Sequence, residues 1–401
     1  MITAKAFAGK HYAVYGLARS GLATAGALIA SGAKVTAWDA KEEARASAPA
    51  GVTLANLDEA DLRQFDSLIV TPGLPLNRHP IAERARNAGV EIIGDIELFA
   101  RARPELPPHK VVGITGTNGK STTTALVHHI LKTAGLPTTM GGNIGLPILA
   151  QDPLPEGGVY VLELSSYQID LTQSLDCDVA VLLNITPDHL DRYENFEAYA
   201  AAKERLLKMS SGAMVRGRNV GLDQAHWPAL QGPHNAQNSA AAIETCEALG
   251  VGEGEIEEGL RTYPGLPHRM ERVREKDGVL FVNDSKATNP TATAPALAAF
   301  PSIRWILGGQ AKTDNLGECA PYFGHVRSAY TIGEAAELFE QLLSPHMSVK
   351  NCGKLADAVR QAAADAAPGD TVLLSPACAS FDQFRDFEDR GDQFRELVEE
   401  L

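Results

Sequence analysis

The chain has 401 residues, of which 44% are hydrophobic and 21% charged, and its formal net charge is −14. This length predicts two or three domains. An acidic balance without Lys/Arg-rich runs argues against a nucleic-acid binder or a membrane-surface protein. Five scattered cysteines without C-x-x-C spacing are typical of a reducing compartment. No signal-peptide core and no membrane-spanning run is apparent, so we expect a cytoplasmic enzyme.

Strands and helices alternate from the N-terminus, beginning with an apolar strand at 11–15 and an Ala/Leu-rich helix. The turn between them, Gly16-x-Ala18-x-x-Gly21, resembles a dinucleotide-binding fingerprint, with Asp39 at the end of the next strand. Alanine at the middle glycine position hinders the close approach of a pyrophosphate. A nicotinamide-dependent oxidoreductase is therefore an alternative that this pattern supports only weakly.

The same alternation continues to the C-terminus, interrupted by two proline-rich segments at 103–110 and 262–269. Strands followed by helices predict parallel sheets covered on both faces. We therefore predict an α/β protein with three domains. Their expected bounds are 1–104 for a Rossmann-like domain, 105–265 for a P-loop ATPase-like domain and 266–401 for a second Rossmann-like domain.

The segment GITGTNGKST, residues 113–122, begins inside an apolar strand at 111–115. The common phosphate-loop pattern G-x-x-x-x-G-K-[ST] requires a glycine where Ile114 stands. Nevertheless, glycines let backbone N–H groups approach phosphate oxygens, and a helix N-terminus adds partial positive charge. Lys120 can reach a β- or γ-phosphate, and the Ser121 hydroxyl can bind Mg²⁺. The segment thus indicates a nucleotide site in preference to an ordinary strand–turn–helix junction.

Two neighbouring strands end in residues that suit a metal site. Glu163 ends an apolar strand, and a buried carboxylate requires a partner or a metal. The next strand is followed by Asp188, His189 and Asp191, and their place beside the phosphate loop favours a metal role over a structural one. Lys203, on a helix at 196–209, reads as an ordinary solvated lysine.

Other polar residues favour a role in binding. Asn235 and Asn238 share a helix face and could read an adenine, unless Asn235 only caps that helix. In the third region, polar clusters follow successive strands and predict one shared pocket edge. Each cluster alone is also typical of an ordinary turn. These clusters contain His268, Arg269, Asp284, Lys286, Thr288, Asn289, Lys312 and Ser380.

Together these motifs resemble the Mur ligases, ATP-dependent amide-forming enzymes of peptidoglycan precursor synthesis, over all three regions. The phosphate loop of that family reads G-T-x-G-K-[ST], which Gly116 to Ser121 matches. Further resemblance lies in GGNIG, LELSSYQ, NITPDHLDRY, HNAQN, LPHRMERV, NDSKATNP and SPACASFDQF. NDSKATN and SPACAS resemble the D-glutamate-adding member, because a diaminopimelate- or lysine-adding member would carry D-N-P-R.

The resemblance implies a reaction in which ATP phosphorylates the carboxylate of UDP-N-acetylmuramoyl-L-alanine. The amine of D-glutamate then attacks the acyl phosphate to give an amide, ADP and phosphate. The resemblance further implies two Mg²⁺ ions, a monomer, and small molecules as the partners. The resemblance also implies that the first domain binds the UDP-muramoyl substrate and that the second binds ATP. The third domain would bind the incoming amino acid and close over ATP.

Residue roles carry over position by position. Lys120 would hold the transferring phosphate, Ser121 and Glu163 one Mg²⁺, and His189 with a carbamylated Lys203 the second. ATP would contact Gly116, Thr117, Asn118, Gly119, Lys120, Ser121, Thr122, Asn235, Asn238, His268, Arg269 and Asp284. The UDP-muramoyl substrate would contact Ser20, Asp39, Gly142 and Asn143, and D-glutamate would contact Lys286, Thr288, Lys312, Ser380 and Phe387.

The chain also departs from the family's pattern. Only 30 residues separate Lys203 from His234, which implies a shortened central domain. Ala40-Lys41 stands where some members have a hydroxyl and an arginine, and Gln310 stands where an acidic residue is common. Two further alternatives stay open: another Mur- or folylpolyglutamate-type ligase, and a nucleotide-binding regulatory protein.

Overall fold

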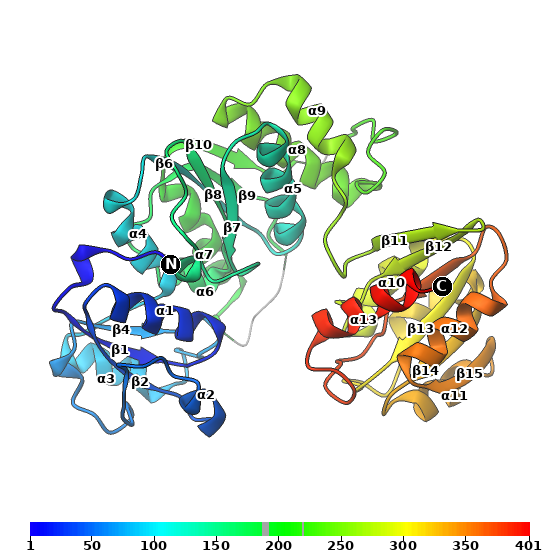
Figure 1. Ribbon diagram of the computed structural model, residues 1–401, viewed down its shortest axis with the longest axis horizontal. Coiled ribbons are helices and arrows are strands. Elements are labelled where there is room, and N and C mark those ends of the chain that lie inside the picture. The colour runs from blue at the N-terminus through cyan, green and yellow to red at the C-terminus, as the bar shows by residue number, and fades with distance from the viewer. Residues whose placement is uncertain (187–191, 219) are drawn as a thin grey trace. The chain divides into compact units, whose positions relative to one another are not determined.

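The computed structural model describes residues 1–186, 192–218 and 220–401. The chain forms two compact units, Met1–Tyr263 and Pro264–Leu401. The described residues build three sheets, two in the first unit and one in the second (Figure 1). Within them the strands pair in parallel, except for β11 (Glu271–Lys276) with β12 (Val279–Asn283). The predicted α/β class is confirmed, and each sheet lies inside one of the predicted domains, whose bounds stay a prediction.

The first sheet has the order β3-β2-β1-β4-β5. The chain therefore leaves β1 on one side to form β2 and returns on the other side to form β4, and ligands of such sheets bind at this point. A Cβ atom on Gly21 would lie 1.8 Å from the Gly16 carbonyl oxygen, so the turn after β1 requires glycine there. The elements are β1 (His11–Tyr15), α1 (Arg19–Ala30), β2 (Lys34–Trp38), α2 (Glu42–Ala46), β3 (Thr53–Leu54), β4 (Ser67–Val70), α3 (Pro80–Ala88), β5 (Glu91–Ile93) and α4 (Asp95–Ala102).

The second sheet has the order β10-β9-β6-β8-β7, with its most apolar strands in the middle. The proline-rich segment at 103–110 forms a short 3-10 helix, Arg103–Glu105, and the start of β6. One hydrophobic core then runs from the first sheet into the second, including Val14, Phe99 and Tyr160. The elements are β6 (His109–Thr115), α5 (Lys120–Thr133), β7 (Thr138–Gly142), β8 (Gly158–Glu163), α6 (Ser166–Asp170), β9 (Cys177–Leu182), α7 (Phe196–Lys208), β10 (Ser210–Arg216), α8 (Pro233–Leu249) and α9 (Glu253–Thr262).

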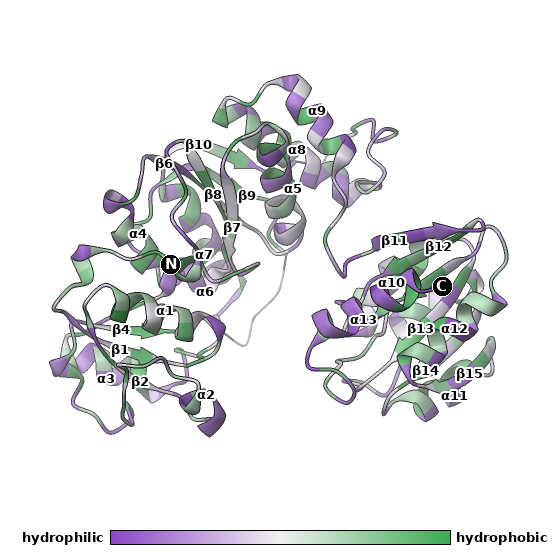
Figure 2. Cartoon of the chain, in the orientation of Figure 1, coloured by the Kyte–Doolittle hydropathy of each residue, from purple (hydrophilic) through white to green (hydrophobic). Residues whose placement is uncertain are grey.

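The third sheet has the order β11-β12-β16-β13-β14-β15, with apolar cores on both faces. Its edge strand β11, with the sequence ERVREK, is hydrophilic, whereas the central β13 is hydrophobic (Figure 2). Its other elements are α10 (Pro290–Ala299), β13 (Ile303–Gly308), β14 (Val326–Ile332), α11 (Ala336–Leu343), β15 (Ser348–Gly353), α12 (Leu355–Asp365), β16 (Thr371–Leu374) and α13 (Phe387–Glu399). Among the described residues, no helix has the length and apolar character needed to cross a membrane.

Candidate functional site

The glycine-rich loop connects the end of β6 to α5 and is held by backbone contacts. Gly119, at φ +84°, caps α5, and a Cβ atom there would lie 2.2 Å from Asn238 Oδ1. Glycine at this position therefore allows α8 to pack against the loop. The Thr117 N–H donates to the Asn184 carbonyl (2.9 Å), and the Asn118 N–H donates to Asn184 Oδ1 (2.9 Å). Asn184 thus fixes the loop conformation from the end of the neighbouring strand β9.

Two lysines donate to the same carbonyl oxygen of this loop. Lys120 Nζ lies 2.9 Å from the carbonyl oxygens of both Gly116 and Thr117. Lys203 Nζ, from the middle of α7, donates to the Gly116 carbonyl at 2.9 Å. These contacts concentrate positive charge at a loop whose backbone already suits anions. The Ser121 and Thr122 side chains follow, half-buried, in the first turn of α5.

The interpretation of Lys203 as a solvated lysine is wrong. Its side chain is only 2% exposed, because α7 turns this residue inward together with Tyr199 and Leu206. Lys203 Nζ lies 4.8 Å from the centre of the Tyr199 ring, whose hydroxyl is 3.0 Å from Thr117 Oγ1. Tyr199 was not singled out from the sequence. Its signal would have been its position four residues, one helical turn, before a buried lysine.

Glu163 lies at the end of β8, beside the loop, because Glu163 pairs with Ile114 of β6. Its side chain is 2% exposed, and Oε1 accepts a hydrogen bond from Asn143 Nδ2 at 2.8 Å. Its other oxygen, Oε2, is buried and has no hydrogen-bond partner within the described residues. Gly142 packs so closely that a Cβ atom would lie 2.2 Å from the Glu163 carbonyl oxygen. Glu163, Gly142 and Asn143 are thus brought together.

The remaining residues expected around ATP in the first unit are only partly described. His189, with Asp188 and Asp191, lies outside the described residues. No group of three His, Cys, Asp or Glu side chains that could hold a metal occurs in the described ranges 1–186, 192–218 and 220–401. The Asn235 side chain does not cap α8, because that helix begins after Gly232 without a side-chain cap. The Asn235 side chain accepts a hydrogen bond from Asn238 Nδ2 at 3.4 Å, and Asn238 is 5% exposed.

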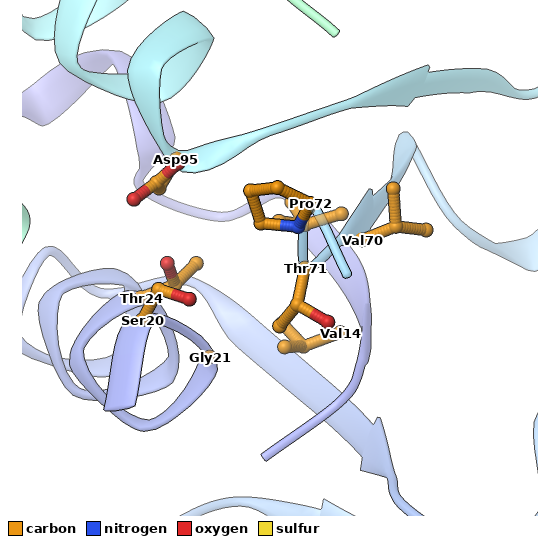
Figure 3. Close-up of a pocket in the computed structure, with 9 residues that line it drawn as sticks. Val14, Ser20, Gly21, Thr24, Val70, Thr71, Pro72 and Asp95 are labelled. Carbon is orange, nitrogen blue, oxygen red and sulfur yellow. The ribbon is translucent and has the colours of Figure 1, made fainter. Parts of the chain in front are cut away.

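The expected substrate residues of the first sheet lie at its carboxyl edge. Asp39 follows β2 and accepts the N–H groups of Leu17 (2.8 Å) and Lys41 (2.9 Å). Ser20 is half-buried in the first turn of α1 and lines a narrow hollow opposite Asp95 (Figure 3). Both residues are therefore at the switch point of the sheet, where a ligand is expected.

In the second unit, His268 and Asp284 lie around the end of β12. His268 has φ +60°, is 6% exposed and lies with Nδ1 3.0 Å from Asn283 Nδ2. Burial lowers the pKa of His268. Asp284 accepts hydrogen bonds from Ser375 Oγ (2.7 Å) and the Met270 N–H (3.2 Å). Burial raises the pKa of Asp284 to about 7. Arg269 is exposed.

The residues expected to hold D-glutamate lie on loops and at the start of α13, and contacts connect these segments. Lys286 Nζ lies 4.9 Å from the Phe387 ring centre, and Lys312 Nζ donates to Thr288 Oγ1 at 3.2 Å. The loop of Lys312 and the loop of Ser380 are joined by two backbone hydrogen bonds between Gln310 and Ala379 (2.9 and 3.0 Å). These contacts support the prediction of a shared edge. Gln310, which had no expected role, therefore connects two of its loops.

Arg390 holds two of these loops through hydrogen bonds and was not identified as a functional residue from the sequence. It is fully buried on α13 and donates to Ser285 Oγ (2.9 Å), the Ser285 carbonyl (2.8 Å) and the carbonyls of Cys378 and Ala379. Burial lowers the pKa of Arg390 to about 10. No motif marked it, because its role follows from tertiary packing alone.

Asp284→Asn should stabilise the protein at alkaline pH and leave its stability unchanged in acid. The pKa of Asp284 is about 7 in the folded protein, above its ordinary value of 3.8. The contribution of protonated Asp284 to the free energy of unfolding is therefore fully present below about pH 4 and is lost as the pH rises from there through 7. The full difference corresponds to about 4 kcal/mol. Urea unfolding at pH 4.5 and 8.5 measures it, with the exposed Asp357→Asn as control. An equal effect at both pH values would contradict a titrating Asp284.

Family models match the chain in three segments. They are described as a "Mur ligase MurD-like, N-terminal domain" at residues 10–94, a "Mur ligase middle domain" at 114–220 and a "Mur ligase, glutamate ligase domain" at 268–378. The UDP-N-acetylmuramoylalanine–D-glutamate ligase of Novosphingobium aromaticivorans is 60% identical, over 100% of this chain and 97% of that protein. The chain belongs to the Mur ligase family.

Other relatives support the same family. This chain is 53% identical to the UDP-N-acetylmuramoylalanine–D-glutamate ligase of Zymomonas mobilis, and the alignment covers both chains completely. Among solved structures, the UDP-N-acetylmuramate-alanine ligase of Thermotoga maritima matches with a TM-score of 0.59 and 18% identity, over 98% of this ligase and 99% of that chain. This likeness confirms the fold alone. The alignment with the Novosphingobium relative spans 429 positions, 28 more than the 401 residues of the ligase.

Proposed function

We propose that this protein joins D-glutamate to UDP-N-acetylmuramoyl-L-alanine in an ATP-dependent, ADP-forming ligase reaction. The observation that carries the proposal is the match, at 53–60% identity over the whole chain, to ligases named for D-glutamate addition. The motifs NDSKATN and SPACAS support the same amino acid. The reaction belongs to peptidoglycan precursor synthesis, and we propose that the protein acts in the cytoplasm as a monomer on small molecules, without nucleic-acid or membrane partners.

In this proposal the loop from Gly116 to Thr122 holds the phosphates of ATP. Its conformation is already fixed by Asn184 and α8, so little rearrangement is needed when the nucleotide binds. Lys120 needs only to turn from the loop carbonyls to reach the transferring phosphate. Asn235 and Asn238 approach the nucleotide from α8, and His268, Arg269 and Asp284 are proposed to contribute from the second unit.

The residues around Glu163 fit a Mg²⁺ ion. A buried carboxylate oxygen without a partner is costly, and Mg²⁺ prefers oxygen ligands of this kind. Glu163 and Ser121 would hold one ion, and His189 together with Lys203 a second. The metal would supply charge neutralisation where phosphate and carboxylate oxygens meet.

We propose that Lys203 acts in its carbamylated form. Carbamylation converts a cation into a carboxylate, which is a suitable ligand for Mg²⁺. The position supports this role, because the side chain is buried and reaches the carbonyl of Gly116 in the phosphate loop. Carbamylation of Lys203 would place a negative charge beside the phosphate loop.

On the substrate side, the chain's own residues orient two anions. Gly142 and Asn143, fixed against Glu163, would contact the UDP-muramoyl substrate together with Ser20 and Asp39. Lys286, Thr288, Lys312, Ser380 and Phe387 would hold D-glutamate. The proposed domain bounds remain 1–104, 105–265 and 266–401. The 28 additional positions in the relative's alignment support a chain that is shortened relative to that protein. We propose that the shortening lies in the central domain, between Lys203 and His234.

The test is ADP release with Mg²⁺, ATP and UDP-N-acetylmuramoyl-L-alanine against a panel of amino acids. We expect release with D-glutamate and at least about 10²-fold less with L-lysine or diaminopimelate. L-lysine lacks a second carboxylate, and diaminopimelate carries its second carboxylate on a longer side chain beside an additional ammonium group. Equal turnover with those amino acids would indicate another Mur-type ligase, and turnover with a folate acceptor a folylpolyglutamate-type one. No ADP release with any substrate would indicate a regulatory protein, and binding of NADH an oxidoreductase.

A further inference from the structure

A buried carboxyl group without a counter-ion lies at the switch point of the first sheet. Asp95 begins α4 and is 5% exposed. Its Oδ1 accepts the N–H of Ile96 at 3.0 Å, and the carboxyl group also accepts a hydrogen bond from the backbone N–H of Asp95 itself. Asp95 is not among the residues proposed to contact ATP, Mg²⁺ or the substrates. An acidic side chain in this state is costly unless it is neutral or finds a ligand.

Asp95 points into the hollow between the ends of β1 and β4 and the first turns of α1 (Figure 3). Ser20, Gly21 and Thr24 of α1 form one wall, and Thr71 and Pro72 form part of another. Parallel sheets bind their ligands at this crevice, and the N-terminus of α1 favours a phosphate there. The hollow has essentially no interior space for a water, so a base or a sugar ring cannot enter it. Asp95 is 5% exposed, so a single ligand oxygen or one water can reach the carboxyl group only from the mouth of the hollow.

Within the part of the chain that the structure describes, no cation lines the hollow around Asp95. Its fellow lining residues in the hollow carry no acidic or basic side chain. On the elements packed around it, Arg19 of α1 is exposed and Glu97 of α4 pairs with Arg101 (2.8 Å). Glu91 of β5 also pairs with Arg101, at 2.7 Å. Burial raises the pKa of Asp95 to about 6. The carboxyl group is therefore easily protonated, and a nearby anion would favour protonation further.

We propose that Asp95 is a substrate-binding residue, protonated in the complex, that donates a hydrogen bond directly or through one water to the diphosphate of the UDP-linked substrate. This inference rests on the proposed function. A protonated carboxyl is a donor that the diphosphate can accept, whereas an ionised one would repel it. Above about pH 6, substrate binding must therefore take up a proton from the solvent at this position.

Calorimetric titration of the whole protein with UDP-N-acetylmuramoyl-L-alanine tests this, in buffers that differ in ionisation enthalpy. At pH 8 we expect uptake of about one proton per bound substrate, and at pH 5 almost none. The Kd should rise about tenfold per pH unit where uptake is complete. Asp95→Asn, which keeps a donor and has no proton to lose, should abolish uptake and flatten this dependence.

Asp66→Asn is the matched control, because Asp66 is exposed at the opposite end of β4 and should leave proton uptake unchanged. Binding without uptake in the unaltered protein would overturn the inference, and so would uptake that persists in Asp95→Asn. These outcomes leave the proposed function intact, which D-glutamate-dependent ADP release tests separately. Absence of binding would overturn the proposed function and this inference with it.

Discussion

Glu163→Gln should reduce ADP release by roughly 10²- to 10³-fold while leaving the protein at least as stable as before. The buried Oε2 has no partner within the described residues, so the carboxylate charge contributes nothing favourable to the fold on its own. Glutamine keeps the acceptor for Asn143 Nδ2 and removes the charge. We expect the free energy of unfolding to stay constant or to rise by about 1–2 kcal/mol.

The two measurements are steady-state ADP release at saturating substrates and urea unfolding without them. Glu156→Gln is the matched control, because Glu156 is exposed on the loop before β8 and should change neither quantity. A structural glutamate would give the opposite pattern, with stability lost and activity retained by the folded fraction. That pattern would remove Glu163 from the proposed Mg²⁺ site.

Lys203→Ala should lose activity by roughly 10²-fold or more and regain part of it when short carboxylates such as acetate or formate are added. The truncated side chain leaves space beside Gly116 and Tyr199, and a small carboxylate there can replace the proposed carbamate. Some stability is also lost, because the Gly116 carbonyl loses a donor. Rescue therefore separates the ligand role from the structural one.

The control for this experiment is Lys208→Ala, which alters an exposed lysine on the last turn of the same helix. It should retain full activity and show no response to carboxylates. If Lys203→Ala stays active, or if its lost activity is not restored by any short carboxylate while its nucleotide affinity is unchanged, Lys203 has no ligand role.

The central strands were predictable from the sequence and most edge strands were not. Apolar runs such as VYVLEL and SIRWILGG mark strands that are buried on both faces. By contrast, β7, β10, β11 and β15 lie at sheet edges and were not predicted. Their sequences contain glycine, serine or alternating charges, because one side faces solvent and needs no apolar residue.

The candidate site divides in the same way. Residues that follow central strands, such as Glu163 and Asp284, could be identified because parallel strands end at a common edge. Lys203, Tyr199 and Arg390 could not be assigned their surroundings from physics alone, since each reaches its loop from a helix distant in sequence. Local periodicity gives a helix face, whereas the partner of that face depends on tertiary packing.

The close contact between Gly142 and Glu163 has a consequence for inhibitor resistance. Any side chain at Gly142, which has φ +86°, would collide with the backbone of the strand that carries Glu163. A compound that binds against the Gly142 backbone would therefore contact a position where substitution displaces Glu163 as well. Escape variants should accordingly arise elsewhere, at side chains such as Leu146, which is 62% exposed on the following loop.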